Sequence, residues 1–307
     1  MQASVDTLTF RNCPSCGELA PTGRPEVRSR ISPDAASTEE FASAWAPTGR
    51  NNCFFDYRRC DSCGLLHNSV YLRPDLIDDA YSHRDDSPVD MPRHFLKMTQ
   101  RRYLEAMEEF APLEGVYLEV GPDIGLAAEV AVERGKLEKV VLVEPNRESR
   151  AVLTKMAAAH NPVVVSSLTE LDDSVRADRV VLIHVLDHLV EPREDLIALR
   201  RRMTAGGLIL VVVHNESSLL RRLLGRRWPP FRLQHPQLFS RRTLPAFLES
   251  CGFRVRSLRA TGNTLSIRHL VRLGFSALGR EPRWIYRVPE IGLTVRLGNI
   301  LAVAEVT

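Results

Sequence analysis

The sequence LEVGPDIGLAAEVAVERG (Leu118–Gly135) joins an apolar run ending in an acid to an alanine-rich helical segment, with glycines at the turn between them. Such joints hold nucleotides, because glycine lets the backbone approach a ligand and the start of a helix offers unpaired amides. The dinucleotide fingerprint would need glycines at 121, 123 and 126, but Asp123 and Leu126 stand at two of these places. No Gly-Lys-Ser/Thr follows, which excludes a phosphate-binding P-loop.

Apolar runs and amphipathic segments alternate on both sides of this joint. The runs predicted as strands are 115–121, 139–145, 162–167, 179–185, 208–213, 253–261 and 298–306. The segments predicted as helices are 126–134, 146–160, 191–203, 240–252 and 267–278, with Asn146 as an N-cap. Near-continuous Val/Ile/Leu strands between helices indicate a parallel sheet covered on both faces. We therefore expect a doubly wound α/β domain with its ligand beyond the carboxyl ends of the strands.

An ordered set of motifs extends this pattern. Glu119, Gly121, Asp123 and Gly125 follow the spacing acid-x-Gly-x-Gly-x-Gly with the middle glycine replaced, and VVLVEP ends in Glu144. ADRVVLIHVLDHLVEP and HPQLFSRRTLPAFLESCGF follow in order. The set resembles the class I S-adenosylmethionine (SAM)-dependent methyltransferases, including zinc-ribbon-bearing members that act on small molecules or sugars. The resemblance implies a Rossmann-like seven-stranded methyltransferase sheet, SAM as cofactor and an enzyme.

The resemblance also implies which residues bind the cofactor. They are Glu119, Gly121, Pro122, Asp123, Gly125, Glu144, Pro145, Ser167, Leu168 and His184. Glu144 would accept hydrogen bonds from the two ribose hydroxyls, as acids do in dinucleotide folds. Asp123 tolerates a left-handed backbone better than most residues, so the turn can survive without its middle glycine. The alternative is a degenerate loop that no longer binds SAM.

Three residues are predicted to act in catalysis. His184, at the end of the fourth strand, is the first choice for a base that removes a proton from the methyl acceptor, and Tyr81 and His235 follow it. In quinone-biosynthesis O-methyltransferases a comparable trio is associated with a divalent cation, and His184, Asp187 and His188 occupy those places here. That metal hypothesis is weaker, and His188 is more often a structural residue.

Two Cys-x-x-Cys-Gly turns occur near the N-terminus, in CPSCG and CDSCG. They carry Cys13, Cys16, Cys60 and Cys63. Two intervening residues let both thiolates face one metal, so the pair of turns predicts a structural Zn²⁺ with four sulfur ligands and no open position for catalysis. Cys53 lacks a partner at this spacing and is interpreted as buried or free, whereas Cys251 lacks a base and is interpreted as a core residue.

The 307 residues allow two domains. We predict a zinc-binding domain with an inserted loop and linker over 1–90, and a methyltransferase domain over 91–307 with a lid around 216–236. A net charge of +3 is too small to argue for nucleic-acid binding. No apolar run approaches the ~20 residues that cross a bilayer, and a signal peptide is not recognised, so a cytoplasmic protein is expected.

The predicted lid carries five arginines, which favour a cap over an anionic substrate or, alternatively, a solvated amphipathic helix. They are Arg221, Arg222, Arg226, Arg227 and Arg232. Three functions follow. The first is O- or C-methylation of a small molecule, with anionic and sugar-like metabolites as candidates. The second is methylation of RNA gripped by the zinc ribbon and the arginines. The third is a non-catalytic partner protein that binds SAM or zinc.

Overall fold

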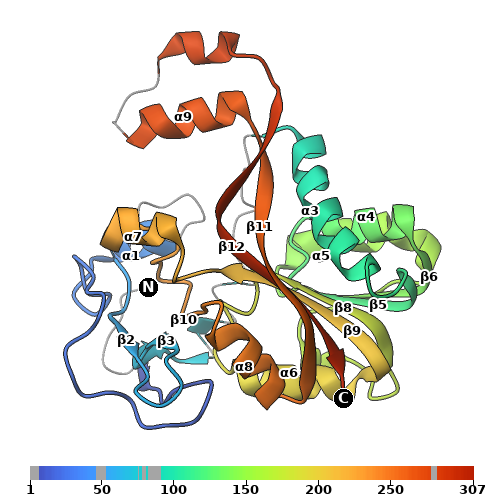
Figure 1. The fold of residues 1–307 in the computed structure, drawn as a ribbon, viewed down its shortest axis with the longest axis horizontal. Coiled ribbons are helices and arrows are strands. Elements are labelled where there is room, and N and C mark those ends of the chain that lie inside the picture. Colours follow the sequence, from blue (N-terminus) through green and yellow to red (C-terminus); the bar gives the residue numbers. More distant parts are fainter. Residues whose placement is uncertain (1–6, 46–52, 75, 78–80, 82–90, 278–281) are drawn as a thin grey trace.

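A seven-stranded sheet forms the centre of the computed structural model, which describes residues 7–45, 53–74, 76–77, 81, 91–277 and 282–307 (Figure 1). Its strands are β5 (Glu114–Val120), β6 (Lys136–Val143), β7 (Val163–Val165), β8 (Ala177–Ile183), β9 (Met203–His214), β11 (Phe253–Ser266) and β12 (Gly292–Val306). They lie in the order β11-β12-β9-β8-β5-β6-β7. The strands from β9 to β7 are parallel, and β12 is antiparallel to both of its neighbours. The predicted Rossmann-like methyltransferase sheet is confirmed.

Helices cover both faces of this sheet, because successive residues of each buried strand point to opposite sides. Tyr117 and Leu118 of β5 illustrate this, since they belong to different hydrophobic clusters. The cluster that contains Tyr117 includes residues of α3 (Arg93–Glu108), α4 (Leu126–Arg134) and α5 (Arg147–Met156). The cluster that contains Leu118 includes residues of α6 (Pro192–Arg201) and α8 (Thr243–Ser250). Short 3₁₀ helices connect some of these elements, namely η2 (Ala158–His160) and η3 (Leu168–Glu170).

The N-terminal region contains short strands and one helix. They are β1 (Leu8–Phe10), α1 (Thr38–Trp45), β2 (Tyr57–Arg59), β3 (Leu66–Asn68) and β4 (Val70–Leu72). Strand β1 pairs with β4, whereas β3 lies between β2 and β10 (Gln237–Leu238), which comes from the second half of the chain. The N-terminal region is therefore completed by β10, which follows five of the seven strands of the central sheet in the sequence. The predicted domain boundary at residue 90 lies outside the described residues.

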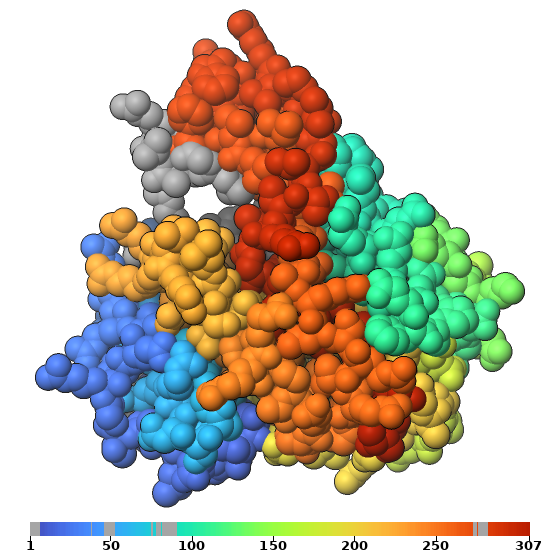
Figure 2. All heavy atoms as spheres, in the orientation of Figure 1, coloured from blue at the N-terminus to red at the C-terminus, as the bar shows by residue number. Residues whose placement is uncertain are grey.

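A two-stranded arm extends from the sheet. Strand β12 pairs with β9 only over Asn299–Glu305, but it pairs with β11 from Gly292 onward. The arm carries α9 (Ile267–Ala277) and η5 (Arg283–Arg287) at its tip, which protrudes from the body in the space-filling view (Figure 2). The predicted strands 253–261 and 298–306 were thus too short, because the paired arm continues past the buried sheet. Among the described helices, none is long and apolar enough to cross a membrane.

Candidate active site and zinc centre

The turn after β5 adopts the left-handed backbone that its glycines predict. The φ angles are 65° at Gly121, 53° at Asp123 and 76° at Gly125. A Cβ atom at Gly121 would lie 2.7 Å from Cγ2 of Val185, so only glycine fits there. Asp123 takes the same left-handed region, which aspartate tolerates, and its N–H donates to Oε2 of Glu144 at 2.9 Å. The turn therefore keeps its shape although the middle glycine is replaced.

Glu144 follows β6 and is oriented by the backbone on both sides. Its Oε1 accepts from the N–H of Asn146 at 2.8 Å, while Oε2 accepts from Asp123. The Asn146 side chain in turn accepts from two N–H groups at the start of α5, so it is the N-cap that the sequence predicted. These two backbone bonds fix the orientation of the Glu144 carboxylate, which is a hydrogen-bond acceptor at both oxygens.

Glu119, at the end of β5, is deeply buried. Only 2% of its surface is exposed, and Oε2 accepts from the Tyr117 hydroxyl at 2.8 Å. Burial raises the pKa of Glu119 to about 8, and the nearby Glu144 carboxylate adds to the increase. Glu119 is thus mostly protonated at neutral pH.

A cavity of about 920 Å³ opens beside this turn and at the carboxyl ends of the parallel strands. The predicted cofactor residues that line it are Glu119, Gly121, Pro122, Asp123, Glu144, Pro145, Ser167, Leu168 and His184. Gly125 is not a lining residue, since it caps the start of α4 and faces Leu153 and Met156. All three predicted catalytic residues, Tyr81, His184 and His235, also line the cavity. The predicted cofactor-binding residues and the predicted catalytic residues thus line the same cavity.

Tyr81, His188 and His235 form a chain of hydrogen bonds in the cavity wall. The Tyr81 hydroxyl lies 2.8 Å from His188 Nδ1, His188 Nε2 lies 3.1 Å from His235 Nε2, and His235 Nδ1 lies 2.7 Å from the Pro230 carbonyl oxygen. The sequence analysis interpreted His188 as more often structural. Its contact with His235 joins residues 47 positions apart, so local spacing held no signal for it.

Hydrogen-bonding rules fix the direction of this chain. The Pro230 carbonyl only accepts, so His235 carries its proton on Nδ1. Burial lowers the pKa of His235 well below its usual value, so the ring is neutral and its Nε2 accepts. His188 therefore donates from Nε2, and in neutral His188 the other nitrogen, Nδ1, accepts from the Tyr81 hydroxyl. Tyr81 thus donates to His188, His188 donates to His235, and His235 donates to the Pro230 carbonyl.

His184 belongs to a different group. Its φ is 54°, its ring stacks on that of His214 at 4.5 Å, and burial lowers its pKa well below the usual value. Nε2 lies 3.4 Å from the Asn299 amide nitrogen, and Nδ1 is buried with no hydrogen-bond partner among the described residues. Neither nitrogen of His184 thus has the directed contact that His188 makes with Tyr81.

The suggested metal trio of His184, Asp187 and His188 does not assemble. Asp187 is fully buried and accepts from the backbone N–H of His214 at 3.0 Å, and burial raises its pKa to about 8. Potential ligand atoms of His184, Asp187 and His214 lie within 4.8 Å of one another, whereas His188 bonds to Tyr81 and His235 instead. The four-residue spacing placed His188 on the same helical face as His184, but the segment is a turn.

Comparison with known proteins agrees with this geometry. A family model described as "Methyltransferase domain" matches residues 93–258. The chain belongs to this methyltransferase family. The predictions of a class I SAM-dependent methyltransferase and of an enzyme are confirmed at that level. None of the curated proteins compared matches the chain.

Solved structures that are similar to this methyltransferase include the following three. One is a putative methyltransferase from Bacillus halodurans, with 14% identity over 66% of this chain and 97% of that chain and a TM-score of 0.45. Another is the N-methyltransferase NodS of Bradyrhizobium japonicum in complex with S-adenosylhomocysteine (SAH), with 12% identity, coverage of 74% and 95%, and a TM-score of 0.47. A third is a chain of the Haloferax volcanii complex between the Trm112 activator and a putative methyltransferase, with 12% identity, coverage of 69% and 92%, and a TM-score of 0.50.

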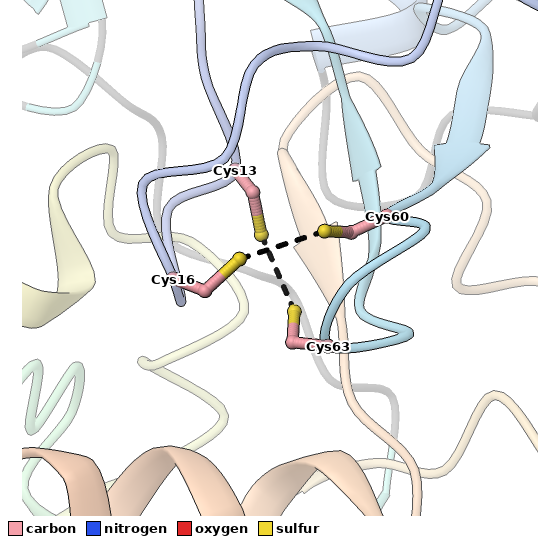
Figure 3. Close-up of side chains that lie close together, drawn as sticks. All are labelled: Cys13, Cys16, Cys60 and Cys63. Atoms are coloured by element: carbon pink, nitrogen blue, oxygen red, sulfur yellow. Dashed lines mark hydrogen bonds between the residues drawn. The ribbon is translucent and has the colours of Figure 1, made fainter.

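The N-terminal region of the methyltransferase contains a cluster of four cysteines that could hold a metal ion. Its members are Cys13, Cys16, Cys60 and Cys63 (Figure 3). Their sulfur atoms lie within 4.8 Å of one another, with two pairs at 3.5 Å, close to the ~3.8 Å edge of a tetrahedron with 2.3 Å Zn–S bonds. Gly17 and Gly64 adopt left-handed backbone after the second cysteine of each turn. Four converging thiols in two matching turns fit a Zn²⁺ ion.

The other two cysteines and the predicted lid are also located. Cys53 and Cys251 are buried in hydrophobic clusters, as the sequence suggested. The lid contains α7 (Leu219–Leu224) and η4 (Gly225–Arg227). Arg232 lines the cavity, whereas Arg221 pairs with Glu26 of the N-terminal region at 2.7 Å. The remaining arginines of the segment, Arg222, Arg226 and Arg227, are exposed.

Proposed function

We propose that the protein transfers a methyl group from SAM to an oxygen or acidic carbon of a small molecule, with Tyr81 and His188 removing the acceptor's proton. The observation that carries this proposal is the directed chain from Tyr81 through His188 to His235, which lies in the wall of the same cavity as the Gly121 turn.

The residues of the turn fit SAM. Gly121 lines the cavity, and Val185 fills the place that a Cβ atom would take, so this turn requires glycine where the backbone borders the cavity. Glu144 is held by two backbone N–H groups and lines the cavity, as a ribose-binding acid requires. A cavity of about 920 Å³ lies at the upper end of the ~300–1,000 Å³ typical of ligand pockets, which leaves space for an acceptor beside the cofactor.

SAM, when bound, supplies a methyl group on a positively charged sulfur and leaves as a neutral thioether. The protein's task is then to align the acceptor and to take its proton. The acceptor's proton moves to the Tyr81 oxygen while the Tyr81 proton moves to His188 Nδ1. The electron pair left on the acceptor forms the new bond to the methyl carbon. His188 becomes an imidazolium, and it later loses the proton to water.

His235 stabilises that imidazolium without taking its proton. Burial keeps His235 neutral, so its Nε2 remains an acceptor for the N–H that His188 carries. The role matches the acid of a catalytic triad, which orients the base and favours its charged form. This proposal gives the proton to His188 instead of His184, which was predicted from the sequence and lacks a comparable directed partner.

Two features favour a small acceptor over RNA. The catalytic chain lines a cavity of about 920 Å³, the size of a small-molecule pocket, and the net charge is only +3. Arg232 is the arginine of the predicted lid that reaches the cavity, and a single guanidinium suits one anionic group on a small substrate. The four-cysteine site would hold a structural Zn²⁺, since all four ligands come from the chain and no position stays open.

The proposal is tested by incubating purified enzyme and SAM carrying a labelled methyl group with a cell extract, which is then separated into small molecules, RNA and protein. We expect label in the small-molecule fraction with wild type and little with His188→Asn. Label in RNA alone would refute the small-molecule acceptor. Binding of SAH by calorimetry without label in any fraction would indicate the non-catalytic alternative.

A further inference from the structure

We propose that the N-terminal zinc-binding region keeps His188 and His235 at hydrogen-bonding distance, and that Arg11 is the positioning residue through which it acts. This inference rests on the proposed function, because it concerns how the Tyr81–His188–His235 chain is assembled. It assigns a role in the acceptor half of the active site to a region whose cysteines alone predict only a structural metal.

The segment that carries His235 is held largely by the N-terminal region. The Tyr57 hydroxyl donates to the His235 carbonyl at 2.6 Å, and the Tyr71 hydroxyl donates to the Leu233 carbonyl at 2.8 Å. Both tyrosines are essentially unexposed, so these bonds are shielded from water. Strand β10, directly after His235, pairs with β3. The backbone around His235 thus follows the position of the N-terminal region.

Arg11 links this segment to the loop that carries His188. Its guanidinium donates to the Val190 carbonyl at 2.5 Å and to the Gln237 side chain at 3.1 Å. Val190 lies two residues after His188, and Gln237 lies two residues after His235. The Gln237 amide continues the link by donating to the carbonyls of Leu186 and Leu189 at 2.9 and 2.7 Å. Arg11 and Gln237 together therefore set the distance between the two loops, and with it the 3.1 Å contact between His188 and His235.

The position of Arg11 depends on the zinc turn beside it. Arg11 is only 6% exposed and stands two residues before Cys13. Burying a guanidinium among neutral oxygens costs free energy. The packing of the surrounding residues must therefore hold Arg11 in this position. Cys13 and Cys60 belong to the same hydrophobic cluster as Leu186. Ligation of the metal therefore anchors the backbone from which Arg11 reaches both loops.

The cofactor half of the cavity is held by different contacts. Gly121 N–H donates to the Val143 carbonyl, and Glu144 accepts from Asp123 and Asn146, so these bonds remain within residues 121–146. The two halves are thus separable. Loss of the Arg11 contacts disorders the histidine chain and leaves SAH binding intact.

The experiment compares Arg11→Met with wild type by two readouts that need no acceptor. Calorimetry with SAH measures the cofactor half, and ¹⁵N spectra of protein labelled at histidine report which ring nitrogen of His188 and His235 carries the proton. We expect wild-type His235 to be protonated only at Nδ1 and His188 only at Nε2. In Arg11→Met we expect both rings to lose their single tautomer while zinc content and SAH affinity stay unchanged. Arg11→Lys, whose single ammonium nitrogen still carries N–H donors, should restore part of the wild-type pattern.

The matched control is Arg193→Met. Arg193 also joins the two regions, donating to the Ser15 carbonyl and to Ser250, and its side chain makes no hydrogen bond to either histidine loop among the described residues. Unchanged tautomers in folded, zinc-loaded Arg11→Met would overturn the inference, and so would equal losses in Arg193→Met. If Arg11→Met does not fold, Tyr57→Phe serves instead, since it removes only the hydroxyl that binds the His235 carbonyl. Wild type that fails to bind SAH would refute the proposed function, while the tautomers would still decide this inference.

Discussion

Replacing Glu119 with glutamine should change how the stability of the protein depends on pH. Glu119 is 2% exposed, and burial raises its pKa to about 8 from an ordinary value of 4.5. Between these two values the native state holds a proton that the unfolded state has released. Raising the pH therefore favours unfolding, so the stability associated with this group is highest below pH 4.5 and is lost as the pH rises to 8.

The size of this change in stability follows from the difference between the pKa of Glu119 in the native state and in the unfolded state. At ~1.4 kcal/mol per pKa unit, a single group with these pKa values lowers the free energy of unfolding by roughly 3–4 kcal/mol between pH 5 and pH 8. Glutamine cannot ionise, but it has the same shape as the protonated acid and still accepts from the Tyr117 hydroxyl. Glu119→Gln should therefore match wild type within ~1 kcal/mol at pH 5 and exceed its stability by about 3 kcal/mol or more at pH 8.

The assay is urea unfolding of the ligand-free protein at several pH values, followed by circular dichroism. Other buried groups titrate in the same range, so the quantity to examine is the difference between variant and wild type at each pH. Glu138→Gln, an exposed carboxyl on β6, is the control and should show no such dependence. If Glu119→Gln and wild type lose stability in parallel from pH 5 to pH 8, the raised pKa of Glu119 is refuted.

Three further results are expected. Purified protein should contain about one zinc per chain, and Cys60→Ser should lower both the zinc content and the melting temperature; metal analysis that finds none in folded wild type would contradict the zinc site. Glu144→Ala should weaken SAH binding by ~1–3 kcal/mol in calorimetry, because it removes acceptors for the ribose, and an unchanged affinity would mean that the cofactor lies elsewhere. Once an acceptor is known, His188→Asn should lower kcat by ~10²–10⁴-fold and His184→Asn by less than ~10-fold, and the reverse order would restore His184 as the base.

Local features of the fold could be predicted because short-range chemistry sets them. The helix after the Gly121 turn runs from Leu126 to Arg134 as predicted, and Asn146 caps the next helix. Each Cys-x-x-Cys turn could be recognised because two intervening residues let both of its sulfurs face one metal. Such features depend on residues within a few positions of one another, where spacing and residue type carry the information.

Pairings between distant segments could not be predicted in this way. The bond between His188 and His235 and the pairing of β3 with β10 depend on how the chain folds back, which periodicity does not encode. The arm was missed for a related reason. Beyond the buried sheet, β12 has exposed residues on most positions of its outer part, so no continuous apolar run marks its start at Gly292.

The pairing of the N-terminal region with the His235 segment also has a consequence for synthesis of the chain. Tyr57 and its acceptor at His235 are 178 residues apart, and Arg11 and Gln237 are 226 residues apart. At ~5–20 residues per second, the Tyr57 hydroxyl waits roughly 10–40 seconds on the ribosome before its partner exists. The N-terminal region is therefore translated first but completed late, and a chain truncated before residue 232 leaves two buried tyrosines without their acceptors.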